Sequence, residues 1–198
     1  MRTLLSFAFP LILVLLSPMA EGQSAPGPGH ASPSLCEVLK SPKLWDGKQL
    51  TLNGSVTLEF ENFTIYDSKC HTWPGIWLMF GGDVPTPTKS TWNDTERPEG
   101  KDIKVNGIAY TIVKDAQLAE FTSAITARSG RKPLYWVTAR LSGTFLAGRP
   151  SKDLPDFPGY GHMGCCYLFV IRQVLSVEKK PRADESEMRH EKNLKGTN

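Results

Sequence analysis

The segment that most constrains the fold is residues 46–60, DGKQLTLNGSVTLEF, which opens as a turn and continues as a strand. Side chains along a strand point alternately to its two faces, and here apolar and polar residues alternate. A glycine inside a strand weakens it unless the backbone bends or another chain comes close, and small closed barrels need such a bend in their first strand. The segment therefore predicts a curled sheet with one buried and one hydrated face. The residues expected on its buried face are Leu50, Leu52, Val56 and Leu58, with Gly54 between them.

The chain begins with the order of features that is typical of a secretory signal peptide. Arg2 precedes a mainly apolar run from Leu4 to Leu16, and small residues follow around Gly22. A transmembrane helix needs about 20 apolar residues, so this run is too short to span a bilayer comfortably. We expect residues 1–22 to be a cleaved signal peptide. The mature protein is then secreted or periplasmic and has no membrane span.

Two further segments lack the pattern of a folded core. Residues 23–33, QSAPGPGHASP, consist of proline, glycine and small residues and predict a flexible linker. Residues 179–198 carry mixed charge without a hydrophobic period and predict a disordered, charged tail. Residues 34–178 remain as the single folded domain.

Four cysteines in an exported chain most often form disulfides. Cys36 and Cys70 are the natural partners for a long bridge. Cys165 and Cys166 are adjacent, and in a strand they would point to opposite faces, while a bond between them would close a strained ring. The sequence does not decide between a bond within this pair and two unbonded cysteines.

The remaining elements predict a fold that consists mainly of strands. Ser34 and Glu37 have the spacing of a capping box at the start of a short helix, which Pro42 ends. Asp115 can cap a helix of about three turns, and Asn106-Gly107 is a strong hairpin signal. We expect further strands at residues 63–66, 76–80, 134–145 and 167–177.

This order is similar to that of the oligonucleotide/oligosaccharide-binding (OB) fold, a five-stranded, partly open barrel. Four stretches of the chain resemble small exported bacterial proteins of unknown function with OB-like topology: SLCEVLKSPKLWDGKQLTLNGSV, IWLMF after a cysteine, VTARLSGTF and GYGHMGCCYLFVIRQV. The resemblance covers about residues 34–178. It implies an OB-like barrel of five or more strands with one longer helix and a short N-terminal capping helix, and it brings no catalytic residue.

The residues are compatible with three classes of function. A binding module would use an aromatic edge on the barrel loops, made up of Trp73, Trp92, Phe157, Tyr160 and His162. The competing interpretation is that these rings plug the barrel ends as part of the core.

An exported metal- or thiol-dependent enzyme is the second class, and it would use Cys70, His71, His162 and Cys165. Their spacing matches no established zinc pattern well. The sequence also contains no G-x-S-x-G or H-E-x-x-H motif, and no cofactor is expected.

Binding of single-stranded nucleic acid or oligosaccharide is the third class. The hydrated face of the first strand offers Thr51, Asn53, Ser55 and Thr57 without basic or aromatic residues between them, which argues against nucleic acid. A net charge of +3 with both signs dispersed does not demand a polyanionic partner either. The sequence therefore favours an exported, non-catalytic binding or interaction module for a small ligand, a glycan or a protein.

Overall fold

The computed structural model describes residues 32–59, 62–70, 74–86, 95–96, 101–150, 152 and 156–182. The predicted signal peptide, all but the last two residues of the predicted linker, and residues 183–198 of the predicted tail lie outside these ranges. Within them, no helix is long and apolar enough to cross a membrane.

Five strands form the centre of the molecule: β1 (Gln49–Glu59), β2 (Asn62–Tyr66), β3 (Ile76–Phe80), β9 (Tyr135–Leu146) and β10 (Tyr167–Pro181). They pair in the cyclic order β1-β2-β3-β10-β9, and β9 pairs with β1 again, so the sheet is closed on itself. The β10–β3 pair is parallel and the other four pairs are antiparallel. The predicted strand-dominated fold with additional helices is confirmed.

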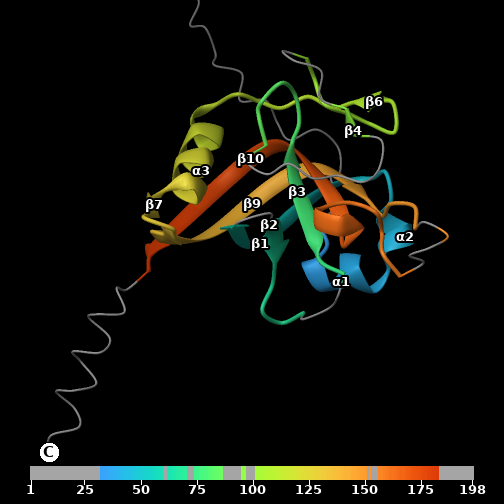
Figure 1. Cartoon of the computed structure of the whole chain (residues 1–198), viewed down its shortest axis with the longest axis horizontal. Coiled ribbons are helices and arrows are strands. Elements are labelled where there is room, and N and C mark those ends of the chain that lie inside the picture. Colours follow the sequence, from blue (N-terminus) through green and yellow to red (C-terminus); the bar gives the residue numbers. More distant parts are fainter. Residues whose placement is uncertain are drawn as a thin grey trace, which may run out of the picture.

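The last strand is longer than the sequence pattern indicated. β10 pairs with β9 as far as Pro181, which lies opposite Tyr135. Figure 1 shows it as a long red strand that runs beside β9 toward the C-terminal end of the described chain. Residues 179–181 of the segment expected to be a disordered tail therefore belong to the sheet, because backbone pairing with β9 holds them despite their charge.

The first helix forms as its capping pattern predicts. Helix α1 (Leu35–Lys40) begins after Ser34, whose hydroxyl accepts from the Glu37 backbone N–H at 3.2 Å, while Glu37 Oε2 accepts from the Ser34 backbone N–H at 2.7 Å. The Ser34 backbone N–H and the Ser34 hydroxyl both donate to the Glu37 carboxylate, and these two hydrogen bonds lower the pKa of Glu37. Helix α1 ends at Lys40, before Pro42, as predicted. Pro42 then opens a second helix that was not predicted, α2 (Pro42–Trp45), because proline is well tolerated in a first helical turn.

The longer helix covers one side of the closed sheet. Helix α3 (Ala116–Thr126) starts at Asp115, whose carboxylate accepts from the Leu118 backbone N–H at 2.9 Å. The ring of Phe121 lies 6.5 Å from that of Phe63 in β2 and 6.1 Å from that of Phe80 in β3. Figure 1 shows α3 on the opposite side of the sheet from α1 and α2. Its buried residues are Leu118, Phe121, Ala124 and Ile125.

Two glycines allow close approaches in the longest strands. A Cβ at Gly54 would lie 2.5 Å from Leu35 Cδ1 and 2.8 Å from the Tyr66 carbonyl oxygen. A Cβ at Gly143 would lie 2.2 Å from the Val170 carbonyl oxygen. Gly54 therefore lets α1 pack directly on β1, and Gly143 lets β9 and β10 come together.

The remaining elements are short. They are β4 (Thr95–Glu96), β5 (Lys104–Val105), β6 (Ile108–Ala109), β7 (Arg128–Ser129), β8 (Lys132–Pro133) and the 3-10 turn η1 (His162–Gly164). β5 and β6 form the hairpin predicted at Asn106-Gly107. β7 and β8 form a second small hairpin directly after α3, where the sequence pattern indicated only the end of the helix.

Strand β3 is buried on both faces, as its continuous apolar sequence predicts. Ile76, Leu78 and Phe80 belong to the main core inside the sheet. Trp77 and Met79 belong to a second core outside it. The other buried members of this outer core are Ile103, Val105, Leu146, Tyr160, Cys166, Leu168 and Val170.

Candidate functional site

The loop that was expected to carry an aromatic binding edge contributes one ring, that of Tyr160, to the outer core. Tyr160 is only 1% exposed, and its hydroxyl accepts a hydrogen bond from Asn106 Nδ2 at 3.2 Å. Phe157 is half-buried and His162 is exposed. Trp73 and Trp92 lie outside the described residues. For Tyr160 the structure therefore supports the competing interpretation, in which the ring is core.

The cysteines proposed for a metal- or thiol-dependent site are oxidised. Cys36 and Cys70 form the predicted disulfide, which fastens α1 to the turn after β2. Cys165 and Cys166 form a disulfide with each other. His71, another residue of that hypothesis, lies outside the described residues. Cys70 and Cys165 consequently offer no free thiolate to a metal or a substrate in this structure.

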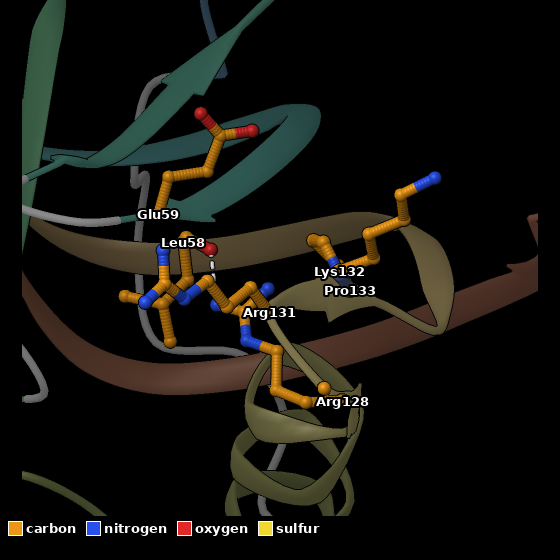
Figure 2. A pocket seen from close by; sticks show the side chains of 7 residues that line it. Leu58, Glu59, Arg128, Arg131, Lys132 and Pro133 are labelled. Carbon is orange, nitrogen blue, oxygen red and sulfur yellow. Dashed lines mark hydrogen bonds between the residues drawn. The ribbon is translucent and has the colours of Figure 1, made fainter.

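An open cleft of about 830 Å³ lies between the end of β1 and the β7–β8 hairpin. We call it the basic cleft and define it by its lining residues: Leu58, Glu59, Arg128, Gly130, Arg131, Lys132 and Pro133. Arg128 fixes the two walls to each other, because its Nη2 donates a hydrogen bond to the Leu58 carbonyl oxygen. Figure 2 shows this bond, with the Lys132 ammonium extending away from Glu59.

The hairpin concentrates positive charge because it turns within very few residues. Arg128 pairs with Pro133, and Ser129 pairs with Lys132, so Arg131 lies at the tip of the turn. Arg131 and Lys132 are exposed, while Arg128 is half-buried. The lining thus holds three cationic side chains and one carboxylate, that of Glu59. Arginine presents a planar set of donors that matches carboxylate, sulfate and phosphate groups.

Positive charge continues from the cleft along the ends of β9 and β10. The Arg182 backbone N–H donates to the Leu134 carbonyl oxygen at 2.9 Å, next to Pro133 of the cleft. The Arg182 guanidinium lies 3.7 Å from the ring centroid of Trp136, which is 53% exposed. Lys180 pairs directly opposite Trp136 in the sheet. Arg182 and Lys180 therefore extend the cationic surface beyond the basic cleft.

Neighbouring Lys179 contributes less to this surface. Its ammonium lies 3.5 Å from a carboxylate oxygen of Glu120 in α3 and 5.9 Å from the Tyr135 ring centroid. A lysine that is paired with a carboxylate offers a reduced charge to a ligand.

The lining of the basic cleft suits the binding of an anion. It combines the cationic side chains of Arg128, Arg131 and Lys132 with the carboxylate of Glu59. The lining can hold an anionic group through cations and through the apolar side chains of Leu58 and Pro133.

The basic cleft was not among the predicted sites. The stretch ARSGRKP, with three cations around a glycine turn, was the available signal. The opposite wall comes from Leu58 and Glu59, and Leu58 lies 70 residues before Arg128 in the chain. Only the fold brings these two segments together.

Comparison with known proteins found no matching protein family, no matching curated protein and no matching solved structure.

Proposed function

We propose that this protein is an exported, non-catalytic binding module with an OB-like barrel, and that it binds an anionic polysaccharide in the basic cleft. The observation that carries the proposal is the arrangement of Arg128, Arg131 and Lys132 around an open cleft of about 830 Å³ that contains the single carboxylate of Glu59. Such an excess of cations in a concave site attracts and orients anionic groups.

The strand order supports the OB-like interpretation. The sheet closes through five strands, and α3 lies in the chain between β3 and β9, which are the third and fourth strands of the closed sheet. A five-stranded closed sheet with a helix in this position fits the topology expected for an OB fold, which commonly binds oligosaccharides or oligonucleotides.

Two observations favour a polysaccharide over a nucleic acid as the partner. The disulfides Cys36–Cys70 and Cys165–Cys166 fit an oxidising compartment, and the apolar run at residues 4–16 fits export. Binding of single strands also relies on open aromatic faces for base stacking. Trp136, an exposed aromatic residue in β9, has one face covered by the Arg182 guanidinium at 3.7 Å.

A charge-reversal pair tests the proposal. In the variant Arg131→Glu/Lys132→Glu, we expect binding of heparin, used as a sulfated polysaccharide probe, to weaken by about tenfold or more, which corresponds to about 1.4 kcal/mol. Affinity is measured by titration calorimetry at two salt concentrations. The salt dependence should decrease together with the affinity, because fewer ion contacts form.

The matched control is Lys43→Glu/Lys69→Glu, which changes the net charge equally at exposed positions in α2 and in the turn after β2. Its affinity should stay close to that of the wild type. Equal weakening by both variants, no heparin binding by the wild type, or tighter binding of a single-stranded oligonucleotide would each contradict the proposal.

A further inference from the structure

The adjacent cysteines lie where a short loop crosses the outer core. Their Cα atoms are 3.7 Å apart, as neighbours in a chain must be, whereas ordinary disulfides join Cα atoms about 4.4–6.8 Å apart. The bond therefore closes a tight ring that contains the peptide group between the two residues. Cys166 is 4% exposed, while Cys165 is half-buried.

The two disulfides of the protein differ in what they contribute to the fold. Cys36–Cys70 joins residues 34 positions apart, and Cys165–Cys166 joins residues 1 position apart. A disulfide restricts the unfolded chain more when the loop that it closes is longer. The adjacent bond consequently adds little global stability, and its conformational effect is confined to the loop that carries it.

That loop is closely fitted to the outer core. Gly161 has φ 75°, and a Cβ there would lie 2.5 Å from Trp77 Cε3 and 3.3 Å from Cys165 Sγ. Tyr160 and Cys166 exchange backbone hydrogen bonds of 2.9 and 3.1 Å. The backbone N–H of Cys165 donates to the His162 carbonyl oxygen at 3.2 Å. The turn at residues 161–164 is thus connected to Trp77 on one side and to the ring closed by Cys165 and Cys166 on the other.

Met163 is held at the tip of this turn with φ 53°, and its side chain is 58% exposed. A non-glycine residue in the left-handed region persists only where its surroundings hold it there. The hydrogen bond of Cys165 to His162 and that of the Gly164 N–H to the Gly161 carbonyl oxygen provide this restraint. Loss of the tight ring at Cys165–Cys166 would remove part of it.

We propose that Cys165–Cys166 is a reversible thiol–disulfide exchange site whose reduction loosens residues 157–166 from the outer core over Trp77. The co-reactant is a dithiol. One of its thiolates attacks the Sγ of Cys165, the more exposed of the two cysteines, and forms a mixed disulfide while Cys166 leaves as a thiolate and takes up a proton. The second thiolate of the reductant then attacks the reductant sulfur that is bonded to Cys165. This closes a disulfide within the reductant and releases Cys165 as a thiolate, which takes up a proton. Two electrons pass to the protein, and the reductant becomes a disulfide.

The first experiment compares the two disulfides in the same folded molecule. The full chain is equilibrated with increasing ratios of reduced to oxidised dithiothreitol, alkylated, and mapped by peptide mass spectrometry. We expect Cys165 and Cys166 to be half-reduced at a ratio lower by about tenfold or more than that required for Cys36 and Cys70, which corresponds to about 30 mV for two electrons. Simultaneous reduction, or earlier reduction of Cys36–Cys70, overturns the proposal.

The second experiment tests the effect on the loop. Hydrogen exchange of the chain with only Cys165–Cys166 reduced should show lost protection at Tyr160 and Cys166, while β1 keeps its protection. The variant Cys165→Ala/Cys166→Ala should show the same loss without reductant, which separates the effect of the bond from that of dithiothreitol. Unchanged protection of the loop in both samples overturns the proposal.

Discussion

At the scale of single residues, Gly54 shows how one missing side chain determines the packing of two elements. A methyl group there would lie 2.5 Å from Leu35 Cδ1, 2.8 Å from the Tyr66 carbonyl oxygen and 2.9 Å from Ile65 Cγ1. The carbonyl oxygen belongs to the backbone of β2 and cannot move without disturbing the pairing with β1. Position 54 therefore has no room for a side chain between α1 and β2.

We predict that Gly54→Ala lowers the free energy of unfolding by about 1–3 kcal/mol, the usual cost of overpacking a core. Urea unfolding monitored by circular dichroism measures the change. Gly75→Ala is the matched control, because a Cβ at Gly75 meets nothing within 4 Å. Equal unfolding midpoints for the two variants would show that α1 and β2 can move apart without cost.

At the scale of elements, the position of α3 depends on its first turn. The Asp115 carboxylate satisfies the Leu118 backbone N–H, and Leu118 begins the buried face that continues with Phe121. Loss of the cap therefore weakens both the helix and its contact with the rings of Phe63 and Phe80.

We predict that Asp115→Ala destabilises the protein by about 0.5–2 kcal/mol, the range measured for helix N-caps. Asp115→Asn should lose less, because its amide oxygen can accept the same hydrogen bond. Thermal unfolding of both variants gives the comparison. If the two substitutions are equally destabilising, the effect comes from the charge of Asp115 and not from its capping bond.

At the scale of the whole molecule, the Cys36–Cys70 disulfide connects the N-terminal helical region to the closed sheet. It closes a loop with a sequence separation of 34 residues. We predict that Cys36→Ala/Cys70→Ala lowers the free energy of unfolding by about 3–4 kcal/mol, from the loop-length dependence of disulfide stabilisation. Urea unfolding checks this value.

The double variant Cys165→Ala/Cys166→Ala serves as the comparison within the same protein, and its loss should be clearly smaller because almost no loop is closed. A larger loss for the adjacent pair would mean that residues 157–166 are essential to the global fold.

Local patterns predicted most of the elements, and tertiary contacts decided the rest. Two features depend only on neighbours in sequence and could therefore be predicted from it: the capping box of Ser34 and Glu37 and the Asn106-Gly107 hairpin. The burial of Tyr160 depends on Trp77 and Asn106, which are distant in the chain. The extension of β10 through Lys179 and Lys180 depends on the backbone of β9.

The pairing of β10 also has a consequence for biosynthesis. This strand joins β3 along one edge and β9 along the other, so the sheet closes only when residues 167–181 are present. Until those residues have been synthesised, the nascent chain carries two unmatched strand edges, the kind of surface on which chains associate wrongly. Its need for chaperone protection should therefore last until β10 is available to pair with β3 and β9.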